Sequence, residues 1–254
     1  MKRDTHASSV SVLKMKKATI FLSAFLAIIS LALSAPCAIS DYAGTYSGTF
    51  SGGDAGIWMA LVEANGNVNF ICWSNSLYEP DGSESMSVDE SGNISGTTDN
   101  GSFFYATIDP SGDVSGTWSG GGNNGTLTGD KCNATILSDL SGTYEGSVSG
   151  DASGSFSIVL NSIGHVTGNA SVEGDKYSIE GGFDDQGNII LDIGGDAGLK
   201  GTVFLSGSVN GNWYHYYEYA SGTFSGSKTS DSTDSGGDGD GGGGGGCFIE
   251  LLSR

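Results

Sequence analysis

Short runs of alternating apolar and polar residues follow one another along most of this chain, and glycine-containing turns separate them. Alternation with a period of two is typical of β-strands that bury one face. No stretch after residue 40 shows the spacing of an amphipathic helix, so we predict an all-β fold. In the first half the pattern predicts strands at about 44–52, 56–63, 67–73, 84–89, 93–98, 102–108, 113–119 and 124–130.

The chain contains this pattern twice. Residues 44–70 align without a gap on residues 142–168, and residues 92–118 align on residues 187–213. Asn-Gly and Ser-Gly pairs supply the positive φ that tight hairpins need. The turns predicted in this way are Asn65-Gly66, Ser91-Gly92 and 110–112 in the first copy, and Ile163-Gly164, Gln186-Gly187 and Ser206-Gly207 in the second.

Short connections between consecutive strands imply antiparallel neighbours, and a meander of about eight strands leaves two open edges unless it closes. We therefore predict two tandem repeats, each an antiparallel meander of about eight short strands closed as a small β-barrel, at residues 41–132 and 139–228. Glycine between large residues on one face, such as Gly48 between Tyr46 and Phe50, lets a narrow barrel pack. One continuous sixteen-stranded barrel is the alternative.

The first forty residues have the features of a targeting segment. Three lysines precede an apolar run at residues 18–33, and small residues at 38–40 offer a cleavage site, so residues 1–40 are predicted to be a signal peptide. An uncleaved N-terminal anchor is the alternative. Cys37 follows the apolar run at the place of a lipidated cysteine, which makes it a candidate lipidation site, although Pro36 precedes it.

The opposite end of the chain changes composition abruptly. Residues 229–246 are rich in glycine, serine and aspartate and are predicted to form a flexible linker. Residues 247–254 form a short tail that contains Cys247, a candidate for C-terminal processing or attachment. A disordered end with one free thiol is the other interpretation.

The charge limits the possible partners. Five of the 10 basic residues and one of the 29 acidic residues fall in residues 1–40, which leaves 5 against 28 and a net charge near −23. Nucleic acids and anionic membranes would be repelled, so a membrane contact is expected only through an anchor. Export makes a disulfide between Cys72 and Cys132 a candidate. No Cys/His set indicates a metal site, and no cofactor is expected.

The phrases GTYSGTFSGG, NGNV, GDVSGTW and SGTFSGSK resemble the glycine-rich β-barrel domains of bacterial surface lipoproteins, including the barrel domains of transferrin-binding proteins. The resemblance covers most of both repeats and implies a surface-exposed barrel of about eight strands. It does not extend to transferrin or iron binding, because no binding residue of that family matches a position in this chain.

Candidate chemistry is sparse after residue 40. His165 follows a predicted turn and is expected to be exposed, and no Ser/His/Asp set or carboxylate pair stands out, so we predict no catalytic residue and no enzyme. The predicted function is that of an exported surface or secreted protein with a structural or interaction role. A small-ligand or glycan binder is the alternative. Its candidate aromatic cluster, on one face of an extended strand, is Trp213, His215, Tyr217 and Tyr219.

Overall fold

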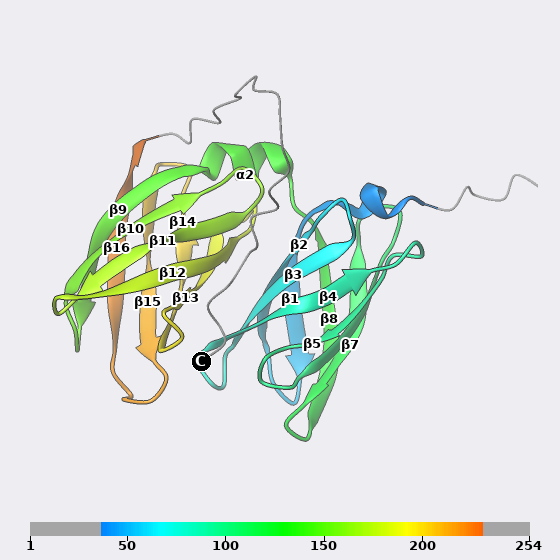
Figure 1. Cartoon of the computed structure of the whole chain (residues 1–254), viewed down its shortest axis with the longest axis horizontal. Helices are drawn as coiled ribbons and strands as arrows, with labels where there is room; N and C mark the ends of the chain where they lie inside the picture. Colours follow the sequence, from blue (N-terminus) through cyan, green and yellow to red (C-terminus); the bar gives the residue numbers. More distant parts are fainter. Residues whose placement is uncertain (1–36, 231–254) are drawn as a thin grey trace, which may run out of the picture. The chain divides into compact units, whose positions relative to one another are not determined.

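The computed structural model describes residues 37–230, apart from the side chains of residues 83–85. Their strands form two closed antiparallel barrels of eight strands each, which confirms the predicted fold and excludes a single sixteen-stranded barrel (Figure 1). Residues 1–36 of the predicted signal peptide, the linker beyond residue 230 and the tail with Cys247 lie outside the described residues. Cys37, at the edge of the described part, is half-buried.

The strands follow the chain order around each barrel. The first barrel consists of β1 (Gly44–Gly52), β2 (Gly56–Val62), β3 (Asn67–Ser74), β4 (Pro80–Val88), β5 (Asn93–Thr97), β6 (Phe103–Ile108), β7 (Val114–Gly120) and β8 (Asn123–Lys131). The second consists of β9 (Gly142–Gly150), β10 (Gly154–Leu160), β11 (His165–Val172), β12 (Asp175–Phe183), β13 (Asn188–Ile193), β14 (Ala197–Val203), β15 (Ser208–His215) and β16 (Ser221–Ser230).

All six predicted glycine turns are present, and they share one geometry. In the turn after β4, Asp89 N donates to Asn93 O, and Gly92 N donates to Asp89 O. Gly92 has a φ of 78°, which only glycine adopts without strain. The Gly92 carbonyl then accepts a hydrogen bond from Ile108 N, which ties the turn to the next hairpin. The same backbone bonds recur at the turns of Gly66, Gly112, Gly164, Gly187 and Gly207.

The first residue of several of these turns also holds the loop through its side chain. Asp184 Oδ1 accepts hydrogen bonds from the backbone N–H groups of Gln186 and Asn188, at 3.0 and 2.8 Å. Asn161 Oδ1 does the same at the turn of Gly164, for Ile163 and His165. Asp184 differs from its counterparts in being almost fully buried, and this burial raises the pKa of its carboxyl group. Burial therefore destabilises the charged form of Asp184 in the folded protein.

Asp184→Asn is expected to raise the free energy of unfolding at pH 7.5 by about 1 kcal/mol and to change it little at pH 4. A carboxyl group whose pKa is higher in the folded protein destabilises the fold while charged, and this penalty disappears as the pH falls through the folded pKa. Asn keeps the oxygen that accepts from the two backbone N–H groups, as Asn161 does at the turn of Gly164, and gives up only the acceptor for Asn188 Nδ2. Urea denaturation at the two pH values measures the difference.

Asp89→Asn is the matched control, with the opposite sign. Hydrogen bonds from the Asn93 side chain and backbone lower the pKa of Asp89 in an exposed turn, so its charge stabilises the fold above the unfolded pKa. Its replacement is expected to lower stability at pH 7.5. An equal effect of both substitutions would contradict the assignment of the penalty to burial.

Paired glycines close both barrels. At the β1–β8 seam Gly48 lies opposite Gly129, and Gly52 lies opposite Gly125. The indole ring of Trp58 lies over the first pair and its Nε1 donates to the carbonyl groups of Thr49 and Thr128, both at 3.3 Å. The second barrel repeats the device at the β9–β16 seam, where Gly146 and Gly226 pair beneath Phe156, and Gly150 and Gly222 pair next to Trp213. The bare backbone thus makes room for the aromatic core, as the sequence predicted.

A short helix precedes each barrel. The 3-10 helix η1 (Ile39–Tyr42) leads into β1, and the α-helix α2 (Ala134–Leu140) leads into β9. Tyr46 Oη donates to Tyr42 O, and Tyr144 Oη donates to Leu140 O, so both junctions are fixed in the same way. The sequence pattern did not predict α2, because seven residues are too few to show a helical period. No helix within residues 37–230 is long and apolar enough to cross a membrane.

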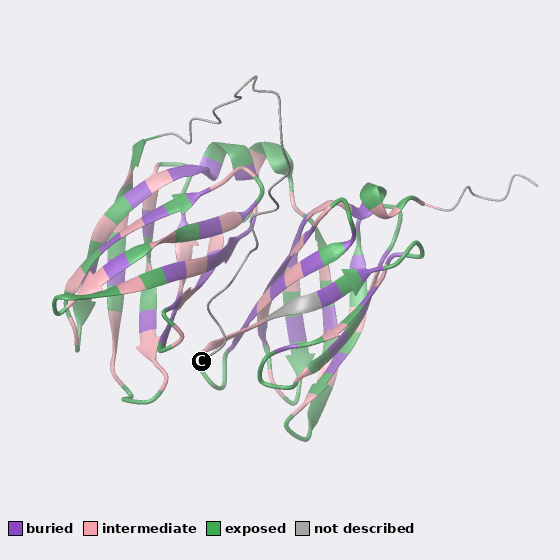
Figure 2. Cartoon of the chain, in the orientation of Figure 1, coloured by how far each residue is buried: buried purple, intermediate pink, exposed green. Residues whose placement is uncertain are grey.

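An apolar cluster joins the two barrels. The outward-facing Met59 on β2 and Trp73 on β3 are buried together with Ile190 on β13, and the Trp73 ring lies 5.9 Å from that of Tyr214 on β15. Thr45 Oγ1 donates to Ile163 O at 2.6 Å beside this cluster. Figure 2 shows by colour how buried, intermediate and exposed residues follow one another along the strands.

The outer faces of the two copies differ in the residues that make this cluster. On β2 and β3 the outward-facing residues of the first barrel are Ile57, Met59, Ile71 and Trp73. The strands β10 and β11 carry the corresponding residues of the second barrel, which are Ser155, Ser157, Asn169 and Ser171. The first copy therefore presents an apolar face where the second presents a polar, half-exposed or exposed one. The two barrels therefore differ in their outer faces, although their folds are the same.

Candidate ligand site between the barrels

The barrel interiors are filled by side chains. The first barrel encloses a cavity of about 20 Å³ with an entirely apolar lining, which has room for little more than one water molecule. In the second barrel the core residues form one continuous cluster, and Leu160, Val166, Phe183, Ile189 and Leu191 are all completely buried. The described side chains therefore leave no space inside either barrel for a binding site of the lipocalin type.

A larger cavity lies between the barrels, beside the apolar cluster. Its volume is about 250 Å³, just below the range of about 300–1,000 Å³ that ligand pockets span. The first barrel contributes residues of β2, β3, the start of β4 and the turn at 98–100. The second contributes residues of β11, β12 and β13 and the turn after β15. We call this cavity the cleft.

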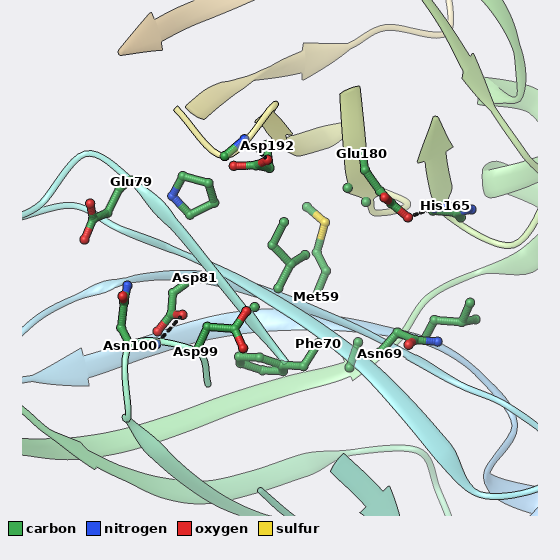
Figure 3. A pocket seen from close by; sticks show the side chains of 18 of the residues that line it. Met59, Asn69, Phe70, Glu79, Asp81, Asp99, Asn100, His165, Glu180 and Asp192 are labelled. Carbon is green, nitrogen blue, oxygen red and sulfur yellow. Dashed lines mark hydrogen bonds and ion pairs between the residues drawn. The ribbon is translucent and has the colours of Figure 1, made fainter. Parts of the chain in front are cut away.

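The centre of the cleft is apolar. Met59 lies between the polar groups of the two barrels in Figure 3, and Phe70 and Ile71 also border the cavity. Met59 and Ile71 point outward from the first barrel because they alternate with inward-facing neighbours such as Trp58 and Cys72. Phe70 borders both the cleft and the small interior cavity, so its ring separates the two spaces.

Acidic side chains of the first barrel form one wall. Asp81, at the start of β4, accepts a hydrogen bond from Asn100 N at 3.3 Å, and burial raises the pKa of its carboxyl group despite this bond. Burial also raises the pKa of Glu79, and the nearby charge of Asp81 adds to the shift. Asp99 follows in the turn between β5 and β6, where its N–H donates to Gly82 O. Three carboxyl groups therefore meet at this wall.

The second barrel supplies two further carboxyl groups. Asp192 on β13 accepts hydrogen bonds from Tyr216 Oη at 3.0 Å and from Gly195 N at 2.9 Å. Burial nevertheless raises the pKa of Asp192, and it also raises the pKa of Tyr216 together with the charge of Asp192. Glu180 on β12 lies 3.5 Å from His165 Nε2, measured from Oε1. His165 is only 14% exposed, which corrects the expectation that it is an exposed residue.

The chemistry of the cleft follows from this lining. Among the described residues, five carboxyl groups, one imidazole and the residues Phe70, Tyr216 and Tyr217 border it, and no described lysine or arginine does. Among residues 37–230 no three His, Cys, Asp or Glu side chains are placed to hold a metal ion together. The cleft therefore offers acceptors and negative charge around an apolar centre.

The predicted aromatic cluster does not form. The strand β15 ends at His215, and a turn follows in which His215 Nδ1 accepts hydrogen bonds from Tyr217 N and Glu218 N. Trp213 points into the barrel and is 6% exposed, whereas Tyr219 is 94% exposed with a φ of 55°. The four residues thus do not share a face, because the extended strand on which that prediction depended stops too early. Only Tyr217 of the four borders the cleft.

The sequence analysis missed Tyr216 and the five carboxyl groups. Tyr216 lies next to a predicted residue, but the turn directs it to Asp192. One sequence signal pointed to the cleft: Met59 and Trp73 occupy outward positions where the second copy has Ser157 and Ser171. Large apolar side chains on one outer face of a strand indicate that something covers it.

The predicted disulfide between Cys72 and Cys132 is wrong, since both cysteines are free. Cys72 faces the interior of the first barrel, and its burial raises the pKa of the thiol well above the usual range. Cys132 lies outside that barrel, where its thiol donates to Ser47 Oγ at 3.5 Å and packs against the core of the second barrel. Burial raises its pKa to about 11. The wall of the first barrel separates the two sulfur atoms.

Comparison with known proteins identifies no relative by sequence: no family model and no curated protein matches the chain. Two solved structures are similar to it. One is a protein of unknown function from the DUF3598 family of Nostoc punctiforme, with 12% identity and a TM-score of 0.25 over 77% of this chain and 99% of that one. The other is described as a putative outer membrane protein of Bacteroides fragilis, with 14% identity and a TM-score of 0.27 over 76% and 99%.

Proposed function

We propose that this chain is an exported, non-catalytic binding protein of the cell surface or the extracellular space, and that its ligand site is the cleft between its barrels. The observation that carries the proposal is the cavity of about 250 Å³ between two barrels with packed interiors. Small-molecule sites are concave and combine apolar surface with a few polar groups, as this lining does.

Export rests on the sequence. The basic and apolar segments of residues 1–33 have the order found in signal peptides, and the large acidic excess suits a protein that stays soluble outside the cell. The resemblance to barrel domains of bacterial surface lipoproteins supports the same compartment. Cys37 and Cys247 remain the candidate points of lipid or covalent attachment.

A ligand screen on a variant with a filled cleft tests the proposal. Gly82 borders the cleft on β4, its φ lies outside the left-handed region, and a Cβ there would meet only the carbonyl oxygen of Phe70, at 3.3 Å, within 4 Å. Gly82→Leu should therefore fill the cavity and require only a shift of a few tenths of an ångström around the carbonyl oxygen of Phe70. A panel of neutral sugars, amino acids, dicarboxylates and amines is screened by thermal shift and ligand-observed NMR.

At least one compound of the panel is expected to bind the wild-type protein and to lose about tenfold or more in affinity for Gly82→Leu, because a Leu side chain occupies the space of the ligand. Ser157→Leu, which adds the same side chain to the outer face of β10, is the control and should bind as the wild type does. A compound that binds Gly82→Leu unchanged would place the ligand elsewhere.

A further inference from the structure

The cleft has charge of one sign on two facing sides. Glu79, Asp81 and Asp99 come from the first barrel, and Glu180 and Asp192 come from the second. Figure 3 shows Asp81 and Asp99 on one side of Met59 and Glu180 and Asp192 on the other. A small anion would be repelled from both sides. A cation would be attracted to each of them, and its hydrocarbon part would meet the apolar centre.

We propose that the cleft binds a linear organic cation with two or more amines on a hydrocarbon chain, such as an α,ω-diamine or a polyamine. This inference rests on the proposed function of the cleft as a ligand site and adds the class of ligand. One ammonium group pairs with the carboxylates of the first barrel and another with those of the second. The methylene chain between them contacts Met59, Ile71 and the edge of Phe70.

The alternative occupants fit the lining less well. A metal ion needs several ligands around one point, and the described residues contain no such set of carboxylate, imidazole or thiol groups. The acidic groups are instead distributed along two walls, which suits a ligand with separated charges. The rings of Tyr216 and Tyr217 add surfaces on which a cation is stabilised.

The state of the buried carboxyl groups agrees with a missing cationic partner. Burial raises the pKa of Asp81, of Asp192 and of Glu79, which means that each charged form is destabilised in the unliganded cleft. An ammonium group nearby would favour the charged forms. Amine affinity should therefore fall as the pH falls through these raised pKa values.

Calorimetric titration with four probes tests the charge requirement, three of them built on the same five-carbon chain. Cadaverine and spermidine carry two or more charges, n-pentylamine carries one, and 1,5-pentanediol carries none. At pH 7.5 and low salt, the two polyvalent amines are expected to bind. The affinity of pentylamine is expected to be lower than that of cadaverine by about tenfold or more, and pentanediol is expected not to bind. Cadaverine affinity is expected to fall as the pH is lowered from 7.5 through the raised pKa values of the carboxyl groups.

Two variants test the two walls separately. The double substitution Glu79→Gln and Asp99→Asn removes charge from the first wall, and Glu180→Gln removes it from the second. Each is expected to weaken cadaverine about tenfold. Glu145→Gln and Asp175→Asn remove the same kind of charge from exposed strand positions and are expected to change the affinity less than about twofold, since exposed pairs contribute little.

Each outcome decides the inference. If the control substitutions weaken cadaverine as much as the wall substitutions do, or if pentanediol binds as well as cadaverine, the amines are not recognised by the cleft and the inference fails. Absence of heat with both polyvalent amines at millimolar concentration also overturns it. If a neutral sugar binds with the Gly82→Leu sensitivity described above while the diamines do not, the ligand class is wrong and the ligand site stands.

Discussion

Gly129→Val is expected to prevent the first barrel from closing and to lower the free energy of unfolding by about 3 kcal/mol or more, the upper end of the effect of overpacking. A Cβ at this position would overlap the carbonyl oxygen of Ser47 on the neighbouring strand and would lie 2.5 Å from the Trp58 ring. Neither group can move easily, because the oxygen belongs to the β1–β8 ladder and the indole Nε1 is bonded to two carbonyl groups.

Urea denaturation followed by tryptophan fluorescence and far-UV circular dichroism measures this effect. Thr128→Val is the control, since it places the same valine side chain at the adjacent residue of β8, on the exposed face, where a β-branched residue is already present. Gly226→Val should destabilise the second barrel comparably, because a Cβ there would lie 2.8 Å from the Phe156 ring. A stability loss below about 1 kcal/mol in Gly129→Val would show that the seam is not as tightly packed as the structure has it.

Trp73→Ala is expected to lower stability by about 3–5 kcal/mol, the usual loss for a buried aromatic residue, and to separate the unfolding of the two barrels. Trp73 is 2% exposed although it points out of its own barrel, and it contacts Ile190 and Tyr214 of the second. Lys200 Nζ also lies 6.0 Å from the centre of its ring. Truncation therefore removes contacts between the barrels and leaves both barrel interiors intact.

Differential scanning calorimetry distinguishes this result from a loss inside one barrel. The wild-type chain should show one cooperative transition and Trp73→Ala two, because the barrels then unfold independently. Ser171→Ala changes the corresponding residue of the second copy and should stay within about 0.5 kcal/mol, as surface substitutions do. A single transition in Trp73→Ala, shifted as a whole, would mean that the barrels are coupled by other contacts such as the Thr45–Ile163 hydrogen bond.

The sequence predicted the barrels well because their determinants are local. Each turn glycine lies a fixed distance after an Asp, Asn, Glu or Phe that bonds back to it, and the strand alternation between turns is nearly regular. The closure of the barrel could also be predicted, because Gly48 and Gly129 alternate with large residues on the inner face. The helix α2 was missed because its length is below two helical turns and its boundaries depend on packing of Leu137 and Leu140.

The candidate site could be predicted less well from the sequence, because it is formed by residues that are distant in the sequence. Asp81 and Asp192 come from different copies, and nothing in either local pattern relates them. The aromatic run after Trp213 was interpreted as a continued strand. Its alternation does not reveal that the strand ends at His215 and that the chain turns at Tyr216. The disulfide prediction failed for the same reason, since pairing two cysteines by compartment ignores which side of a barrel wall each occupies.

The polar outer face of the second copy has a consequence for assembly. The contact between the barrels is of the head-to-tail kind, in which an apolar face of one module meets a different face of the next. Such contacts are not self-complementary, and where their rotation does not close a ring they continue from molecule to molecule as a fibre. With Ser155, Ser157, Asn169 and Ser171 in place of the apolar set, the second module lacks the apolar face that a third would need. The outer face of β10 and β11 therefore does not repeat the apolar contact that joins the first module to the second.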